Sequence, residues 1–245
     1  MSETSVLVVL LAVEAGRDEQ FNQHHDAHVA EMLEVPGFTA AQRFRRSETQ
    51  LPDHATEALG YAYLAIYEIE GSPEAAITEL LARHRAGRYD EYRRNMAGTL
   101  LGTQSTCWTP QGEVDGSFEG ATGRLLDLLS VADADDDAAD DADAWRRDEE
   151  RRRRALSTLP GVTALQGFAA SSFQVPSAAS RRSDHRLMGL CAVREPVRAT
   201  RDALAALPSG DGVAGTARHS VFYEAVTERR GTGAAGSAAR GTARA

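Results

Sequence analysis

Apolar runs along the first half of the chain predict strands, and longer stretches with helical spacing predict helices. The first helix begins near Asp18, a residue type that caps helices, and reaches about Glu34. The second begins at Pro73, which the first turn of a helix tolerates, and reaches about His84. The order is strand, helix, strand, strand, helix, strand. The strands cover 6–13, 38–46, 61–70 and 105–109, with a loop over 48–59 and a short helix over 89–96.

The same order of patterns recurs in the second half, where Pro196 begins a helix that runs through Leu204 and Leu207. Residues 133–143 are almost purely Asp and Ala and lack the Gly and terminal Glu of an EF-hand. We therefore expect a solvated insertion there, and a disordered tail from Arg230 onward. The other elements are strands over 125–131, 162–173, 187–193 and 220–226, a helix over 145–159 and a loop over 174–183.

A segment of twelve residues occurs twice, at 36–47 and at 160–171, and predicts a tandem duplication. The matched pairs are Pro36/Pro160, Gly37/Gly161, Thr39/Thr163, Ala40/Ala164, Gln42/Gln166, Phe44/Phe168 and Ser47/Ser171. Each βαββαβ half reads as a ferredoxin-like α+β unit with helices on one face of an antiparallel sheet. The two bare faces can bury each other, which predicts a dimeric α+β barrel built from one chain. The predicted domains are 1–118 and 119–229, followed by the tail 230–245.

Composition narrows the classes of partner and the compartment. The formal net charge of −9 argues against a nucleic-acid or anionic-membrane surface, which needs a basic patch. Only two cysteines occur, Cys107 and Cys191, far apart and without a CxxC, which favours a reducing cytoplasm and buried thiols. The apolar run 6–13 is too short to cross a bilayer and follows Glu3 rather than a positive segment, so we expect no signal peptide.

Candidate chemistry is concentrated in the first helix, at His24, His25 and His28. At about 100° per residue, His25 and His28 fall in one apolar stripe with Phe21 and Met32, while His24 lies at its edge. Asp26 points away from this stripe. Imidazole changes charge near neutral pH, so the pair suits general acid–base catalysis; a pair of packed core histidines is the alternative.

A metal site is a weaker interpretation of the same helix. His24 and His28 have a workable ligand spacing, but His24 and His25 point about 100° apart, so the three rings do not share one ion easily. When the two halves are aligned on the repeated segment, His24, His25 and His28 correspond to Asp148, Glu149 and Arg152 in the second half. We therefore expect the first half to be active and the second to be structural.

The strands of the first half offer polar and aromatic side chains for a pocket. Gln42 recurs as Gln166 on an apolar face, whereas Arg43 becomes Gly167 and is specific to the first half. Arg43 can bind a carboxylate or enolate, or it can be a plain surface arginine. Tyr61, Tyr63 and Tyr67 share one strand face, where they either line a pocket or pack in the core. The candidate substrate contacts are Tyr63, Tyr67, Arg43, Gln42 and His24.

The sequence from Phe21 to Phe44 resembles the opening of EthD-like and antibiotic-biosynthesis-monooxygenase-like proteins of the dimeric α+β barrel superfamily. The resemblance rests on Phe21-Asn22, His24-His25-Asp26, His28, Pro36-Gly37-Phe38 and Arg43-Phe44-Arg45, and on the strand 63–69. It implies that His28 takes the position of the recurrent pocket histidine. The fusion is also similar to chlorite dismutase-like haem proteins, which carry an axial histidine in their second half. Here only His185 and His219 are available there.

These observations together predict a cytoplasmic enzyme that uses no cofactor and no metal, on a hydrophobic, carbonyl-bearing small molecule such as an aromatic polyketide. His28 would move a proton beside the carbonyl, His25 would orient or relay, and Arg43 or a strand tyrosine would hold the enolate. Cyclisation, isomerisation and decarboxylation all fit. The alternatives are a non-catalytic small-molecule-binding protein and a haem enzyme. The expected assembly is a monomer with an internal pseudo-dimer, or a homodimer, with no nucleic-acid or membrane partner.

Overall fold

The computed structural model describes residues 4–51, 60–131, 139–174, 185–194, 197–206 and 216–232. These residues form an α+β fold of strands and five helices. In chain order the elements are β1 (Ser5–Val13), α1 (Asp18–Met32), β2 (Phe38–Arg46), β3 (Tyr63–Ile69), α3 (Pro73–Arg85), α4 (Asp90–Met96), β4 (Leu100–Gly116), β5 (Gly123–Val131), α5 (Ala139–Ser157), β6 (Val162–Ala170), β7 (His185–Val193), α6 (Val197–Ala205), β8 (Thr216–Ala225) and β9 (Arg230–Gly231). None of the described helices is both long and apolar enough to cross a membrane.

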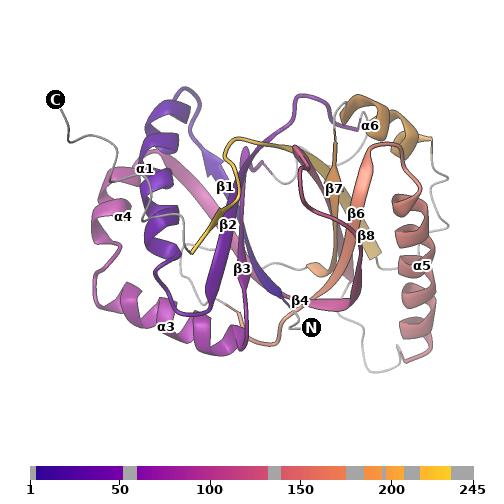
Figure 1. Cartoon of the computed structure of the whole chain (residues 1–245), viewed down its shortest axis with the longest axis horizontal. Coiled ribbons are helices and arrows are strands. Elements are labelled where there is room, and N and C mark those ends of the chain that lie inside the picture. Colours follow the sequence, from indigo (N-terminus) through magenta and orange to yellow (C-terminus); the bar gives the residue numbers. More distant parts are fainter. Residues whose placement is uncertain are drawn as a thin grey trace.

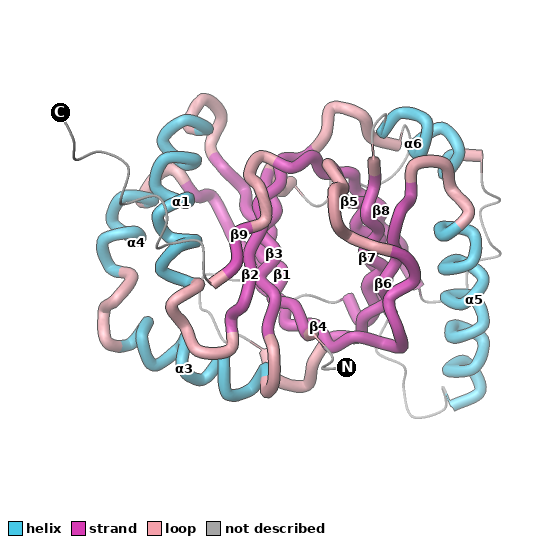
Figure 2. The backbone as a smooth tube through the Cα atoms, in the orientation of Figure 1, coloured by secondary structure: helices cyan, strands magenta, loops and turns pink. Residues whose placement is uncertain are grey.

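Eight strands form a closed antiparallel barrel, in the order β3-β1-β4-β6-β7-β5-β8-β2, with β2 returning to pair with β3 (Figure 2). The short strand β9 adds to β2 beyond the end of β8. The predicted α+β barrel within one chain is therefore confirmed. Strands of the first half lie in the order β4-β1-β3-β2 and those of the second half in the order β8-β5-β7-β6.

The helices cover the outside of the barrel, with α1, α3 and α4 against the first half and α5 and α6 against the second (Figure 1). The buried apolar residues accordingly divide into a barrel interior and a helix–sheet layer on each side. Along β1, Val6, Val8 and Leu10 face the interior, whereas Leu7 and Leu11 face the helices, as the alternation of side chains in a strand requires.

Strand β4 joins the two halves and is much longer than the predicted strand over 105–109. Its first part pairs with β1 and its last part, from Trp108 to Gly116, pairs with β6 of the second half. The end of this strand is exposed and polar, so its sequence carries no apolar alternation that would predict a strand. Its extension depends on a partner from the other half of the chain.

Strands β8 and β9 make the reciprocal connection from the second half back to β2. The prediction that the disordered tail begins at Arg230 is therefore wrong for Arg230 and Gly231, which pair with Ala41 and Ala40. The rest of the predicted tail, 233–245, lies outside the described residues. Helix α5 begins at Ala139, inside the segment predicted as a solvated insertion, and residues 133–138 of that segment lie outside the described part.

Equivalent hydrogen bonds tie each half to the last strand of the other. The Gln50 side chain donates to the carbonyl of Phe222 and accepts from its N–H, and it also donates to the Ser47 carbonyl. Gln174 makes the same three contacts with the backbone of Cys107 and Ser171. The chain therefore closes the barrel with one set of contacts used twice.

The repeated Pro-Gly motif also has one structure in both halves. Gly37 and Gly161 adopt positive φ angles of 94° and 83°, and their carbonyls accept from the N–H groups of Glu70 and Arg194. A Cβ atom at Gly37 would lie 3.0 Å from the Cβ of Ala76 on α3. The glycine is thus required by both its backbone conformation and the close approach of the helix.

Candidate functional site

Helix α1 places the predicted histidines as the helical spacing indicates. Its buried face consists of Phe21, His25, Val29 and Met32, and His25 is only 2% exposed. His28 lies beside this face, with 14% of its side chain exposed. His24 is half-buried at the edge, where its Nδ1 lies 3.5 Å from the Asn95 amide nitrogen. The two central histidines therefore lie together, and His24 lies at the rim.

Tyr92, from α4, contacts both imidazoles. The Nδ1 atom of His25 is 2.6 Å from the Tyr92 hydroxyl oxygen. The His28 ring stacks on the Tyr92 ring, with centroids 3.9 Å apart and an interplanar angle of 6°. Tyr89 meets His28 edge-on at 5.2 Å. We call these four residues, His25, His28, Tyr89 and Tyr92, the imidazole–tyrosine cluster.

Three buried polar atoms of the cluster have no hydrogen-bond partner among the described residues: His25 Nε2, His28 Nδ1 and the Tyr89 hydroxyl. The Glu31 carboxylate lies 3.5 Å from His28 Nδ1, on the same helix and partly exposed. Buried polar groups are normally paired, so three unpaired atoms in one layer call for an explanation. Contact with a ligand is one such explanation.

Burial keeps both imidazoles neutral. Desolvation lowers the pKa of His28 to about 4, with a smaller contribution from His84. Desolvation, followed by the charge on Arg43 and by His28, lowers the pKa of His25 well below its ordinary value. Desolvation also raises the pKa of Tyr92. At neutral pH the cluster therefore contains neutral imidazoles and protonated phenols.

Arg43 is not free to bind a substrate carboxylate with its terminal nitrogens. Its side chain is 3% exposed, and its two Nη atoms donate to Asp26 at 2.5 Å and to Asn22 at 2.6 Å. The guanidinium lies 5.2 Å from the centre of the Phe21 ring. Asp26 lies away from the apolar stripe, as predicted, and 40% of its side chain is exposed, but it also pairs with Arg43, which was not predicted. These contacts fix α1 against β2.

The strand tyrosines divide between two layers. Tyr63 and Tyr67 are buried in the helix–sheet layer, and the Tyr63 hydroxyl donates to Asp18 at 2.5 Å. Burial raises the pKa of Tyr67 beyond its ordinary value. Tyr61 instead packs against the barrel interior, because β3 begins only at Tyr63. The prediction that all three share one strand face is therefore wrong for Tyr61.

Gln42 lies apart from the histidines. Its side-chain nitrogen donates to the carbonyl of Thr227, and its oxygen accepts from the buried Arg124. In the second half, Gln166 donates in the same way to the carbonyl of Gly112 on β4. Gln42 therefore has a structural role on the barrel side of β2. A register shift between Phe38 and Ala40 also places Phe38 in the helix–sheet layer, whereas Phe44 of the same strand faces the barrel interior.

The equivalent layer of the second half contains an ion network in place of the imidazole–tyrosine cluster. Buried Asp127 accepts from Arg152, from Arg218 at 2.6 Å and from the Ser220 hydroxyl. Arg218 also pairs with Glu149. Burial would raise the pKa of Asp127, but both guanidiniums and these hydrogen bonds outweigh it and hold the pKa below its ordinary value.

An arginine also occupies the second half at the place of Arg43, but it comes from the helix. The guanidinium of Arg153 on α5 lies over Gly167, 3.3 Å from where a Cβ atom would be. The sequence has Gly167 in β6 where the first half has Arg43 in β2. The cation of this layer therefore comes from a strand in the first half and from helix α5 in the second. The two helix–sheet layers of the chain are chemically different.

The contacts of α4 with α1 were not predicted. The sequence pattern predicts a short helix over 89–96, but it gives no sign that Tyr89 and Tyr92 contact His28. Their spacing of three residues, on one side of a helical turn, matches that of His25 and His28 and could have indicated a facing pair. Only the packing of α4 against α1 brings the four rings together.

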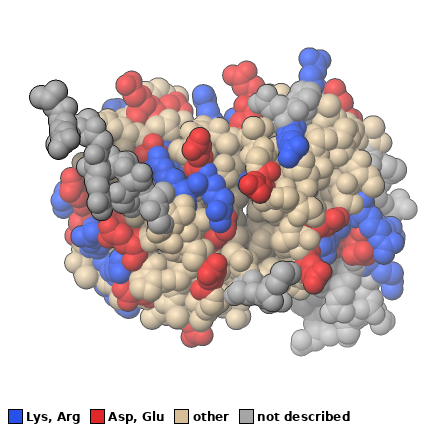
Figure 3. All heavy atoms as spheres, viewed as in Figure 1, with Lys and Arg blue, Asp and Glu red and all other residues tan. Residues whose placement is uncertain are grey.

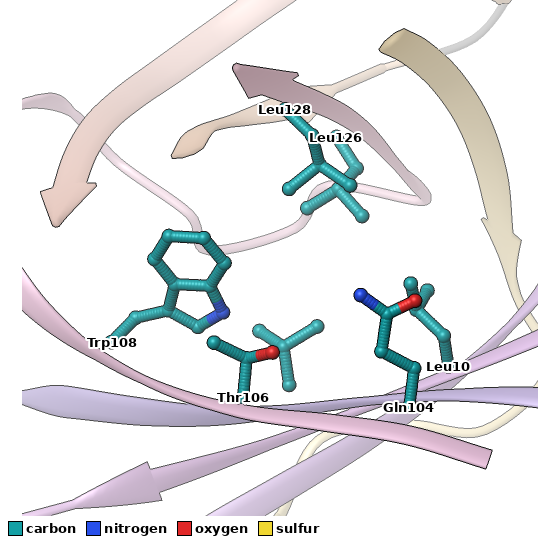
Figure 4. A pocket seen from close by; sticks show the side chains of 7 residues that line it. Leu10, Gln104, Thr106, Trp108, Leu126 and Leu128 are labelled. Carbon is teal, nitrogen blue, oxygen red and sulfur yellow. The ribbon is translucent and has the colours of Figure 1, made fainter. Parts of the chain in front are cut away.

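A cavity of about 10 Å³ lies inside the barrel, lined by Val8, Leu10, Gln104, Thr106, Trp108, Leu126 and Leu128 (Figure 4). The indole nitrogen of Trp108 points into this space and has no partner among the described residues. This volume holds about one water molecule. It is therefore too small for an organic substrate.

The described residues contain no cluster of three or more side chains suited to holding a metal ion. Of the two histidines considered for haem, the His185 side chain lies outside the described part. His219 pairs in register with Leu128, a residue of the barrel interior. The described side chains of that interior, packed around a water-sized cavity, do not fit a haem at His219.

The charged residues on the face shown in Figure 3 alternate between acidic and basic and form no single basic area. This distribution agrees with the negative net charge of the chain. The absence of a nucleic-acid partner stays a prediction.

Solved structures share this fold at low sequence identity. An anthrone oxidase-like protein aligns over 95% of this chain and 94% of its own, with a TM-score of 0.57 and 9% identity. A presumed monooxygenase from Fusobacterium nucleatum subsp. nucleatum ATCC 25586 aligns over 94% and 96%, with a TM-score of 0.54 and 9% identity. A presumed chlorite dismutase aligns over 92% and 96%, with a TM-score of 0.50 and 10% identity. No family model and no curated protein sequence matches the chain. The likeness shows that the chain has the fold of the dimeric α+β barrel proteins.

Proposed function

We propose that the chain is a tandem duplication of one ferredoxin-like unit, with halves at 1–118 and 119–229. The strand orders β4-β1-β3-β2 and β8-β5-β7-β6 correspond position by position. The paired contacts of Gln50 and Gln174, and the shared conformation of Gly37 and Gly161, support the same conclusion. Strand β9 is then the counterpart of the end of β4. An EthD-like ancestry is part of this proposal.

We further propose that the first half carries a cofactor-independent acid–base site for a hydrophobic, carbonyl-bearing small molecule, such as an aromatic polyketide. The observation that carries the proposal is the imidazole–tyrosine cluster, with unpaired buried nitrogens on both His25 and His28. Neutral imidazoles can accept or donate one proton without a metal. The surrounding rings of Phe21, Tyr89 and Tyr92 favour a flat, apolar substrate.

The proposed reaction begins at a carbon next to a carbonyl group. His28 takes the proton from this carbon, the electron pair of the C–H bond forms a C=C bond, and the π pair of the carbonyl moves onto its oxygen to give an enolate. The ring centroids of His25 and His28 are 5.7 Å apart, so one carbonyl-bearing substrate can contact both imidazoles. His25 then stabilises the enolate oxygen. Isomerisation, cyclisation or reaction with dioxygen can follow from this enolate. Decarboxylation of a β-keto acid would instead form the enolate directly, by breaking the C–C bond to the carboxylate and releasing CO2.

Two further features support this choice of substrate. Arg43 is paired with Asp26 and Asn22, so the helix–sheet layer offers no free guanidinium of Arg43 to a substrate anion. The name of the anthrone oxidase-like neighbour refers to an aromatic carbonyl compound. Both features favour a neutral aromatic ketone over a charged acid.

The test compares turnover of anthrones, small lactones and β-keto acids by wild type and by His28→Ala. We expect His28→Ala to lose about 100-fold or more of the activity while its circular dichroism spectrum stays unchanged. The exposed neighbour His84, changed to alanine, serves as the matched control and should keep the activity. Full activity of His28→Ala would contradict the proposal.

A non-catalytic small-molecule-binding protein is the second candidate. It is favoured by the deep burial of His25 and by the close stacking of His28 on Tyr92, both of which also occur in packed cores. In that case no compound is turned over, and His28→Ala lowers stability by about 1–3 kcal/mol. Haem is the remaining alternative, and a Soret band on titration with haemin would identify it.

A further inference from the structure

We infer that Tyr92 fixes His25 in the tautomer that carries its proton on Nε2, so that His25 presents a hydrogen-bond donor to a substrate oxygen. The tautomer is a property of the folded chain alone. Its catalytic use rests on the proposed function. Tyr92 itself touches no reacting atom in this scheme and is therefore a positioning residue.

The length of the contact favours the Tyr92 hydroxyl as the donor. The Tyr92 hydroxyl oxygen lies 2.6 Å from His25 Nδ1. Hydroxyl donors form hydrogen bonds of about 2.5–3.0 Å, whereas N–H donors keep about 2.7–3.2 Å from an oxygen acceptor. The contact therefore fits a phenol O–H that donates to an unprotonated Nδ1. A neutral imidazole with Nδ1 unprotonated carries its proton on Nε2.

The number of unpaired groups leads to the same tautomer. His25 Nε2 is buried without a partner among the described residues. If Nδ1 carried the proton, the Tyr92 hydroxyl hydrogen and the Nε2 lone pair would both lack a partner within those residues. With the proton on Nε2, only the Nε2–H is left unpaired. Each unpaired buried group costs free energy, so the second arrangement is favoured.

The surroundings of His25 exclude the doubly protonated form. Arg43 approaches from β2 and His28 from the same helix, and both disfavour a further positive charge. Phe21 stacks on the His25 ring at 4.9 Å, which adds an apolar neighbour. Tyr92 from α4 is a protonated phenol. His25 therefore remains neutral, and its single proton lies on the nitrogen that faces no protein acceptor among the described residues.

This arrangement separates the tasks of the two histidines. His28 accepts the proton from the substrate carbon, the bonding pair forms a C=C bond, and the π pair of the carbonyl moves onto its oxygen. The Nε2–H of His25 donates to that oxygen as its negative charge develops, and no proton needs to leave His25. A neutral imidazole donor of this kind stabilises an enolate without carrying a charge of its own. Tyr92 holds the donor in place and stacks on the base, so one side chain positions both histidines.

The tautomer can be measured directly by long-range ¹H–¹⁵N NMR of the imidazole rings at neutral pH, because protonated and unprotonated ring nitrogens resonate far apart. Wild type should show a protonated Nε2 and an unprotonated Nδ1 for His25. Tyr92→Phe should change this spectrum towards a mixture of both tautomers. Tyr89→Phe, which removes the other phenol of the cluster, is the matched control and should leave the His25 signals unchanged.

A proton on Nδ1 in the wild type would overturn the inference, and this result does not depend on any variant folding. An unchanged His25 spectrum in Tyr92→Phe would overturn the role of Tyr92. His28→Ala should keep the His25 tautomer, so loss of the proposed function and loss of the tautomer are separate results. With an active substrate, we expect Tyr92→Phe to lower kcat by about 10- to 100-fold with a smaller effect on KM.

Discussion

The burial of His28 predicts a specific loss of stability in acid. Its pKa falls from 6.5 to about 4 in the folded chain, because burial disfavours the charged ring. The unfolded chain therefore takes up this proton at a higher pH than the folded chain. The free energy of unfolding contributed by His28 is complete above pH 6.5 and is lost as the pH falls towards 4.

The magnitude follows from the two pKa values. Each unit of difference corresponds to about 1.36 kcal/mol, so we expect a loss of about 2 kcal/mol between pH 7.5 and pH 5. The loss reaches about 3 kcal/mol at pH 4. The charged and titratable groups that face His28 are His25 and Glu31 on α1, His84 on α3, and the phenols Tyr89 and Tyr92.

Urea unfolding of wild type and His28→Gln at pH 7.5 and pH 5 isolates this contribution. Glutamine does not titrate, so the variant should lose about 2 kcal/mol less than wild type between the two pH values. The remaining acid sensitivity, from His25 and from carboxylates such as Asp127, is common to both proteins. His84→Gln removes an exposed histidine that accounts for only the smaller part of the lowered His28 pKa, so this variant should keep most of the wild-type difference. Equal losses in wild type and His28→Gln would refute the buried, neutral state of His28.

Two further variants test the fold. Asp127→Asn leaves two guanidiniums of the second half without their buried carboxylate and should lower the free energy of unfolding by about 3–5 kcal/mol, measured in urea; a shift below about 1 kcal/mol would contradict the network. Gly37→Ala combines a positive φ with a close contact to Ala76 and should lower the melting temperature more than Gly16→Ala, where φ is 80° but no atom lies within 4 Å of the new Cβ. Equal melting temperatures of the two glycine variants would show that the contact with α3 does not matter.

The sequence predicted the fold well where side-chain periodicity and turn residues decide local structure. The apolar run of β1, the Pro-Gly motif before β2 and the proline that begins α3 each determine the structure of residues next to them in the sequence. The extent of β4 and the existence of β9 could not be predicted in this way. Their residues are polar and exposed, and they become strands only because β6 and β2 supply hydrogen-bond partners from the opposite half.

The candidate site was predictable on α1 but not beyond it. Helical spacing places His25 and His28 on one face, because 3.6 residues per turn is a property of the helix alone. Which side chains meet that face depends on tertiary packing. Tyr92 from α4 reaches His25, and Arg43 from β2 pairs with Asp26, and neither contact is visible in the sequence. Gln42 follows Ala41 and precedes Arg43 in β2, so strand alternation places its side chain on the barrel side, where it contacts Arg124 and Thr227.

The barrel is closed by two unlike halves that belong to one polypeptide. In an assembly of two identical subunits, a codon change alters both subunits at once, so a catalytic residue cannot be lost from one alone. Here Arg152 and Asp127 occupy the second half while the imidazole–tyrosine cluster occupies the first. A single chain can thus keep an imidazole–tyrosine cluster in one half and an ion network in the other. A ligand of the described cluster is accordingly expected to saturate at one molecule per chain.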